Sequence, residues 1–437
     1  MKRNFGLKFL LSGSVTVSTA LFAAEAPAPT NAPTATNSVS LEALVADVVE
    51  HNPELNFYRA EIAAARGERR TAGTLANPEA SATLGHKRVS AAGEGLAWSV
   101  SVQQTFEWPG RLPLRKAIAN HQVTLADLGL AQFRTALAAR ARTLAYGLFA
   151  AQQKAAAARE VADRFQALRE VLVQRDPAGL TPLLETRIIE ATEITLQHQA
   201  AEAVIEAQAA LLALNQLRGQ PWEESLRIAQ ASLAFSDAPE IATLLAAART
   251  NNFDLKMRQT ELEQQGFKVS LAKNERHPSF SVGPYLSQER AGDRETQVGL
   301  GVTIPLSLWN RNKGGIEVAQ AREAQAQTSL YVTQREIERN VAEQAIRYAT
   351  KLNQMAKWRP DSVEQFRDAA TLADRHYRLG AVPIATYVEL QKQYLEAVEA
   401  LLDTKREALE AGQEIQRLTG LDFHAVTVTE PKKEESK

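Results

Sequence analysis

The chain has 437 residues, 50 Lys plus Arg against 51 Asp plus Glu, 6% aromatic residues and no cysteine. Its length allows a large core, and few aromatics with abundant alanine favour long helices over a β-sandwich. The composition excludes a disulfide framework, a thiolate metal site and a lipid anchor on cysteine, and near-neutral charge argues against a general nucleic-acid binder.

Residues 1–23 predict a secretory signal peptide. Three cations within the first eight residues precede an apolar stretch from Phe9 to Phe22, and small residues suited to cleavage follow. The alternative is a retained anchor, but the apolar part is shorter than the roughly 20 residues that span a bilayer. Residues 24–39 are rich in Pro, Ala and Thr and predict a flexible segment. We therefore expect an exported protein.

The rest of the chain predicts no membrane-spanning helix. The best candidate, Leu128 to Ala151, carries three arginines in its middle, each of which costs about 3 kcal/mol at a bilayer centre. If the mature chain enters a membrane, strands closed into a barrel must carry it across.

Two halves of the chain repeat one pattern. Landmarks recur in the same order at an offset of 200 or 201 residues, which indicates a duplicated unit. The landmark pairs are Asn52-Pro53-Glu54-Leu55 with Asn252-Phe253-Asp254-Leu255, Asn77-Pro78 with His277-Pro278, Trp98 with Val298, Arg111 with Arg311, and Gly179-Leu180-Thr181-Pro182 with Gly380-Ala381-Val382-Pro383.

Each unit begins with helices and continues with two strands. Ser40 is a candidate N-cap for a helix from Leu41, and Asn52 with Pro53 opens a second helix. Strands are predicted near 79–89 and 96–106, with a matching hairpin at 278–306. Their residues alternate between an apolar side and a small or polar side, which is typical of transmembrane strands. Half-buried strands of a soluble α+β domain are the alternative interpretation.

Aromatic residues lie on or beside these strands. Trp98 shares the apolar side of its strand, and Trp108 and Trp309 follow just past strand ends. Tryptophan is enriched where a membrane meets water. We therefore assign these three residues to a membrane interface.

A very long helix follows the first pair of strands. Residues 112–175 contain no proline apart from Pro113, which is tolerated in a first helical turn. At 1.5 Å per residue this helix would span roughly 95 Å, far more than a compact domain holds. Apolar residues recur at heptad spacing in the helices that return after each turn, which indicates coiled-coil hairpins. The chain is therefore predicted to be elongated.

Counting strands requires several copies of the chain. Two strands in each of two units give four, whereas single-chain membrane barrels need at least about eight. Unpaired strand edges in lipid are prohibitive, so copies must pool their strands. The count alone allows two or more protomers.

The strand-to-helix junctions at 104–111 and 304–314, the duplication and the two glycine tips resemble the TolC-type outer-membrane efflux channels over residues 40–420. The second junction and Asn77-Pro78-Glu79 are most similar to the heavy-metal branch with CzcC-like and CusC-like members. The resemblance implies a mainly α protein with membrane β-strands, which forms a homotrimer with a 12-strand outer-membrane barrel and a periplasmic helical tube. It also implies a periplasmic adaptor (a membrane fusion protein), a proton-driven inner-membrane pump, contact with outer-membrane lipid, and efflux of cobalt, zinc, cadmium or copper.

This interpretation divides the chain into a signal peptide, a linker, two repeats with a connector between them, and a charged tail. The segments are 1–23, 24–39, repeat 1 at 40–218 with its β-hairpin at 79–106 and its tip at 176–182, the connector at 219–238, repeat 2 at 239–420 with its tip at 378–383, and the tail at 421–437.

The tips and the helices beside them are the expected functional sites. In the family that the chain resembles, adaptor hairpins dock at the tips and polar contacts close the tube nearby. The adaptor contact is assigned to Gly179, Leu180, Pro182, Gly380, Ala381 and Pro383. The gate is assigned to Tyr377, Thr386, Glu389 and Glu185, where threonine replaces one of the two acids of the family pattern.

No enzyme, cofactor or metal site is expected. The seven histidines are scattered singly, and no phosphate-binding glycine loop or nucleophile elbow is present. Multidrug or solvent efflux and type I secretion remain alternative cargoes. A periplasmic adaptor and a structural coiled coil are alternatives of another class, but neither needs duplicated alternating strands.

Overall fold

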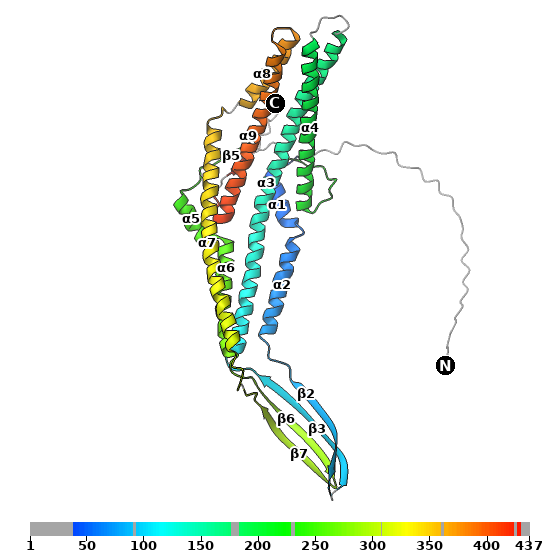
Figure 1. Cartoon of the computed structure of the whole chain (residues 1–437), viewed down its shortest axis with the longest axis vertical. Coiled ribbons are helices and arrows are strands. Elements are labelled where there is room, and N and C mark those ends of the chain that lie inside the picture. The colour runs from blue at the N-terminus through cyan, green and yellow to red at the C-terminus, as the bar shows by residue number, and fades with distance from the viewer. Residues whose placement is uncertain are drawn as a thin grey trace, which may run out of the picture. The chain divides into compact units, whose positions relative to one another are not determined.

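The computed structural model of the chain describes residues 38–90, 93–175, 183–228, 232–306, 308–359, 362–423 and 426–429. The predicted signal peptide, nearly all of the predicted linker and the first glycine tip lie outside the described residues. Figure 1 shows the arrangement of the helices and strands. The elements are β1 Ser38–Val39, α1 Leu41–His51, α2 Leu55–Ala72, β2 Glu79–Val89, β3 Gly93–Phe106, α3 Arg111–Arg175, α4 Leu183–Arg218, β4 Arg227–Ile228, β5 Ser232–Phe235, α5 Ile241–Asn251, α6 Phe253–Asn274, β6 Phe280–Ala291, β7 Asp293–Thr303, α7 Lys313–Ala356, α8 Ser362–Arg378, α9 Ile384–Thr419 and β8 Val426–Thr429.

Local capping explains where the first helices begin. The Ser40 hydroxyl accepts a hydrogen bond from the backbone N–H of Ala43 at 3.3 Å, so it caps α1 as the sequence predicts. Asn52 ends α1, and its side-chain oxygen accepts from the N–H of Glu54 at 2.9 Å before α2 begins. Two short helices at an angle to one another therefore replace one continuous helix.

The helix α3 has 65 residues and packs against α2, α4, α6 and α9. At 1.5 Å per residue it is about 100 Å long. Its fully buried positions alternate small and large side chains, including Ala141, Ala145, Leu148 and Phe165. Alanine at these positions lets neighbouring helices approach closely, which is how the predicted hairpin with α4 is packed.

The rising helix of the second hairpin is interrupted between α7 and α8. α7 ends at Ala356 with the tightened bonds Lys357 N–H to Gln354 and Trp358 N–H to Met355, and α8 begins at Ser362. The sequence has proline at 360. Proline donates no hydrogen bond and disfavours helical geometry in the residue before it, so the helix cannot run through.

The main sheet has the order β2-β3-β6-β7, and every neighbouring pair is antiparallel. The observed strands agree with those predicted near 79–89, 96–106 and 278–306. Hairpins join β2 to β3 and β6 to β7, and the central β3–β6 pair joins strands from the two halves of the chain.

Two small sheets join segments that are far apart in the sequence. β1 pairs in parallel with β4, and β5 pairs with β8 in antiparallel register. Ser38 and Val39 therefore form a strand at the end of the predicted flexible linker, and β8 lies within the predicted charged tail. Both segments pair with strands in the predicted connector at 219–238.

Among the described helices, none combines the length and apolar character that a bilayer crossing requires.

Candidate functional site

The four-stranded sheet has one apolar side. Cross-strand partners face the same side, and the register aligns Leu84 with Trp98, Val100 with Leu286, and Leu286 with Val298. These side chains are not covered by the chain itself: Leu84 and Val298 are each 78% exposed. The other exposed apolar residues of this side are Leu96, Val102, Phe106, Leu300 and Val302.

The opposite side is small and polar. Hydroxyl pairs bridge neighbouring strands at Ser81 and Ser101, 2.8 Å apart, and at Thr83 and Ser99, 2.6 Å apart. Glycine and glutamine fill further positions of this side on β7, opposite serine and tyrosine of β6. The sheet therefore has one apolar side and one polar side that is suited to contact with water.

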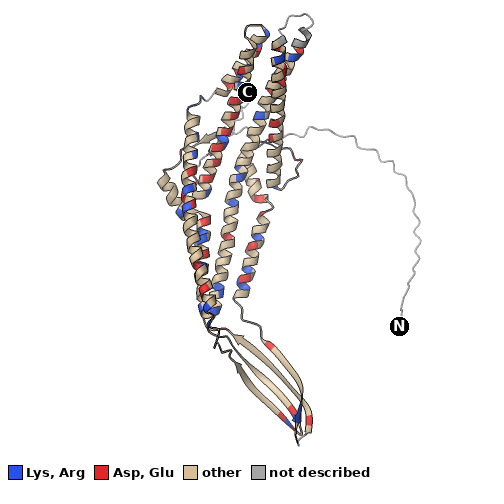
Figure 2. Ribbon diagram, viewed as in Figure 1, with Lys and Arg blue, Asp and Glu red and all other residues tan. Residues whose placement is uncertain are grey.

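Charge is absent from the middle of the described strands. Residues 80–86, 95–106, 280–288 and 296–303 contain no Lys, Arg, Asp or Glu. Charged residues gather instead at the hairpin turns, where Arg88 pairs with Glu94 at 2.7 Å and Lys87 pairs with Glu289. Figure 2 shows this uncharged band between the turn end and the helices.

The predicted interface aromatics differ in their surroundings. Trp309 is 93% exposed just past β7, and Trp108, just past β3, stacks on His277 with ring centroids 4.7 Å apart. Trp98 is half-buried within β3, nearer the hairpin turn. The two junction tryptophans therefore lie at the helix end of the sheet, and Trp98 lies toward the other end.

The second glycine tip is a tight helix reversal. Gly380 has a φ of +72°, which favours glycine, and its N–H donates to the carbonyl of Tyr377 at 2.9 Å. Ala381 N–H donates to His376, and Pro383 directly precedes α9. The corresponding residues Gly179, Leu180 and Pro182 lie outside the described residues.

The predicted gate residues lie on three helices. Tyr377 of α8 stacks on Tyr387 of α9, with ring centroids 5.2 Å apart and planes 14° apart. Thr386 and Glu389 are exposed on α9, and Glu389 accepts a hydrogen bond from Gln393 at 2.8 Å. Glu185 lies in the first turn of α4. The structure thus places Tyr377 against the buried core and leaves Thr386 and Glu389 on the surface of this protomer.

A partly buried polar cluster beside Tyr387 was missed by sequence analysis. The Arg164 guanidinium of α3 donates to Gln391 at 3.2 Å and to Thr371 at 3.0 Å, and it pairs with Glu160 at 2.7 Å. Gln391 is fully buried and donates to the carbonyl of Ala370 at 2.7 Å. The cluster therefore joins α3, α8 and α9 at one level.

Tyr387 is fully buried between this cluster and Phe165, whose ring centroid lies 5.0 Å away. Burial raises the pKa of the Tyr387 hydroxyl above its usual value, and the negative charge of Asp374 raises it further. The phenol therefore stays neutral. The neighbours of Tyr387 come from distant parts of the chain, so no local pattern marks this site.

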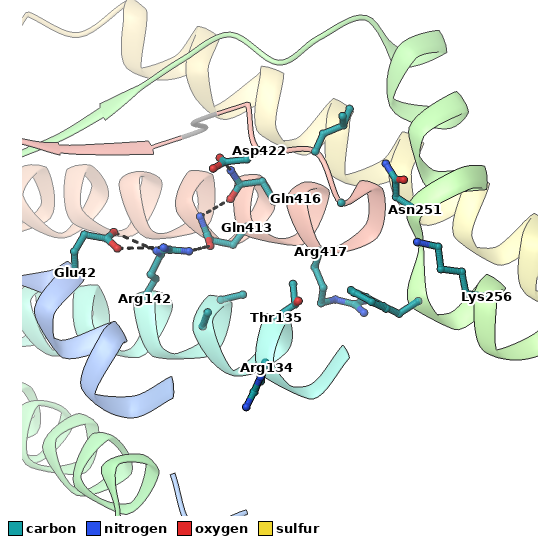
Figure 3. A pocket seen from close by; sticks show the side chains of 15 residues that line it. Glu42, Arg134, Thr135, Arg142, Asn251, Lys256, Gln413, Gln416, Arg417 and Asp422 are labelled. Carbon is teal, nitrogen blue, oxygen red and sulfur yellow. Dashed lines mark hydrogen bonds and ion pairs between the residues drawn. The ribbon is translucent and has the colours of Figure 1, made fainter. Parts of the chain in front are cut away.

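A polar cavity of about 770 Å³ lies where α1, α3, α5, α6 and α9 meet. Figure 3 shows its side chains, of which Arg142 forks onto Glu42 at 3.1 and 3.2 Å and donates to Gln413 at 3.2 Å. Gln413 donates to Gln416, which donates to Asp422, both at 2.9 Å. This chain of hydrogen bonds joins α1, α3 and α9, so these polar groups serve as a structural joint.

Within the described parts of the chain, no three His, Asp or Glu side chains are grouped so that they could hold a metal ion. His86 lies 3.8 Å from Glu94 at the sheet's turn end, and His121 lies 3.8 Å from Glu263 between α3 and α6. Each is a single histidine beside one carboxylate.

Comparison with known proteins agrees with this geometry. Residues 244–421 match the family model described as outer membrane efflux protein. No curated relative matches the chain by sequence. The resemblance to TolC-type channels is therefore confirmed for this segment by the family match.

Solved channel proteins share the fold over 87–88% of this chain. The outer-membrane channel OprN has a TM-score of 0.71 at 20% identity and covers 87% of this chain and 89% of its own. CusC has a TM-score of 0.70 at 15% identity, with coverages of 88% and 92%. The CmeC outer membrane channel of Campylobacter jejuni has a TM-score of 0.70 at 14% identity, with coverages of 87% and 85%.

Proposed function

We propose that the protein is the outer-membrane channel of a tripartite efflux system of the resistance-nodulation-division type. The observation that carries this proposal is the uncharged four-stranded sheet with an exposed apolar side and a polar side. Contact of the apolar side with lipid would lower the free energy by about 25 cal/mol for each Å² of apolar surface removed from water. The polar side would then line a passive exit duct.

The sheet order supports assembly from several copies. β2 and β7 are the outer strands, so each has one edge without a partner among the described residues. An unpaired backbone group in lipid costs several kcal/mol, so β2 of one copy must pair with β7 of the next. Three copies would close a 12-strand barrel, and their long helices would continue it as a periplasmic tube.

The helix tips are proposed to dock a periplasmic adaptor that links the channel to a proton-driven inner-membrane pump. Gly380, Ala381 and Pro383 form a compact reversal at one end of α8 and α9. Gly179, Leu180 and Pro182 complete the proposed contact. Replacing Gly380 by a bulky residue should abolish crosslinking to the adaptor while the channel still reaches the outer membrane.

The gate is proposed at Tyr377, Thr386, Glu389 and Glu185. Tyr377 stacks on Tyr387, which lies beside the Arg164 cluster. This contact holds the ring of Tyr377 in one position at the end of α8. We expect the double variant Tyr377→Phe with Glu389→Ala to raise single-channel conductance in planar bilayers. Unchanged conductance would count against a resting closed state held by these residues.

Heavy-metal cations are the proposed cargo. This choice rests on the junction at 304–314 and on Asn77-Pro78-Glu79, which resemble the cation-efflux branch. Multidrug or solvent efflux is the alternative. A deletion strain should lose resistance to cobalt, zinc, cadmium or copper and regain it from a plasmid copy; loss of drug resistance alone would favour the alternative.

The channel itself is tested by fractionation and electrophysiology. The processed protein should sediment with the outer membrane, migrate as a trimer unless boiled and form discrete conductance steps in planar bilayers. A monomer that stays in the soluble periplasmic fraction and never inserts into liposomes would exclude the proposed function.

A further inference from the structure

The junction between the sheet and the helices carries an excess of positive charge. We consider the last turns of α2 and α6, the first turns of α3 and α7, and the loops that join them to the strands. These segments, 69–78, 107–116, 271–279 and 304–318, contain nine Lys or Arg against three Glu. Figure 2 shows basic residues gathered at this level.

The four segments form one rim because the strands are antiparallel and in register. The start of β2 lies beside the end of β3, Phe106 pairs with Phe280, and Ser281 pairs with Thr303. Hydrogen bonds also hold the loops together. Asn274 donates to the carbonyl of Pro109 at 2.9 Å, and Asn312 donates to that of Ala272 at 2.9 Å.

Most of the rim cations lack a carboxylate partner. Arg115 pairs with Glu107 at 2.8 Å. Arg111 is held by neutral acceptors, the Ser279 hydroxyl at 2.9 Å and the His277 carbonyl at 2.7 Å, so its charge is not neutralised. Seven more are exposed and have no ion pair among the described residues: Arg69, Arg70, Lys116, Lys273, Arg276, Arg311 and Lys313.

The rim also borders the apolar side of the sheet directly. The uncharged stretches of β3 and β6 begin beside it, and the exposed ring of Trp309 lies within the rim segment 304–318. A surface that passes from apolar to indole to cationic over a few residues matches the layers of a bilayer with anionic headgroups.

We infer that this basic rim binds anionic phospholipid headgroups of the leaflet next to the helical end of the sheet. The inference rests on the proposed function, because it needs the sheet to be in lipid. Each basic side chain near an anionic surface favours binding by about 1 kcal/mol, or about fivefold. The rim should therefore enrich anionic over zwitterionic lipid around the channel.

The test uses the full processed protein reconstituted into phosphatidylcholine vesicles that contain either brominated phosphatidylglycerol or brominated phosphatidylcholine at the same fraction. Bromine quenches nearby tryptophan, and Trp309→Phe identifies the part of the signal that comes from Trp309 in the rim. We expect brominated phosphatidylglycerol to quench tryptophan more strongly than brominated phosphatidylcholine, which would correspond to a local enrichment of up to about fivefold. High salt should remove this difference.

The variant Arg311→Gln with Lys313→Gln should reduce the enrichment. The matched control, Arg159→Gln with Arg359→Gln, removes two exposed cations outside the rim and should leave it unchanged. Equal quenching by both lipids, in a protein that floats with the vesicles, would overturn this inference but not the proposed function. It would favour an acidic protein as the partner of the rim. Failure to float with phosphatidylcholine vesicles would instead count against the proposed function.

Discussion

The side chain of Asn252 donates a hydrogen bond to the carbonyl oxygen of Leu418 at 2.9 Å, across 166 positions of sequence. Asn52 makes the same bond to Leu217 at 2.7 Å in the first half of the chain. Both asparagines are buried, and each also accepts a backbone N–H at the start of the next helix. One asparagine therefore caps a short helix and closes the end of a long one in each half.

Asn252→Ala should destabilise the protein. The change removes the cap on the Leu255 N–H and leaves the buried Leu418 carbonyl without this donor, so we expect a loss of about 2–4 kcal/mol in the free energy of unfolding. Urea unfolding followed by circular dichroism in detergent would measure it. Asn120→Ala, at an exposed helical position, is the control and should change the midpoint little.

Gly420→Ala should cost more than Gly380→Ala, although both glycines have positive φ values of 63° and 72°. A Cβ at 420 would lie 2.8 Å from the Cβ of Asn251, whereas a Cβ at 380 would meet nothing within 4 Å. We expect about 2–4 kcal/mol for Gly420→Ala and about 1–2 kcal/mol for Gly380→Ala. Equal shifts in thermal midpoint would show that the contact with Asn251 relaxes at no cost.

Val298→Arg and Gln297→Arg should have different effects, because these neighbouring residues lie on opposite sides of the sheet. Val298 is 78% exposed on the apolar side, and Gln297 pairs with Ser287 on the polar side. An arginine facing lipid near the bilayer centre costs about 2–4 kcal/mol, whereas one facing water costs little. Outer-membrane levels of heat-sensitive trimer should fall for Val298→Arg alone. Equal levels of the two variants would argue against lipid contact at this side.

Alkaline pH should unfold the helical part while its buried tyrosines are still neutral. Burial is the main cause that raises the pKa values of Tyr146, Tyr348 and Tyr387, and Asp403, Asp237 and Asp374 respectively raise them further. The unfolded chain releases these protons near pH 10, whereas the folded chain releases them only at higher pH. The contribution of these tyrosines to the free energy of unfolding is therefore complete below about pH 10 and is lost as pH rises above it.

Near-ultraviolet absorbance of phenolate, recorded together with circular dichroism, would measure this. A late group of tyrosines should ionise only as helicity falls, and Tyr387→Phe should shrink that group by one. Ionisation of all eight tyrosines before any loss of helicity would contradict the assignment.

The larger elements were predictable because their signals are local. The Ser40 cap, the long run of α3 without proline after its first turn and the two-residue alternation of β2, β3, β6 and β7 each depend on neighbours within a few residues. Alternation also places Leu96, Trp98 and Val100 on one side of β3, which the register agrees with. The resemblance to a channel family followed from the order of these same elements.

Shorter or more distant features could not be predicted in this way. β1 and β4 have two residues each, and β5 and β8 have four, too few for a periodic pattern. The Arg164–Gln391 bond joins positions 227 residues apart, and no local pattern marks either residue as its partner.

Helix and strand periods, caps and the two sides of the sheet are thus written into the amino-acid order, because backbone hydrogen bonding and the burial of apolar side chains act over a few residues. The pairing of β3 with β6, the joints made by Asn52 and Asn252 and the basic rim needed the folded chain. Each brings together groups whose separation in sequence exceeds any local period, so only the tertiary packing of the helices and strands determines them.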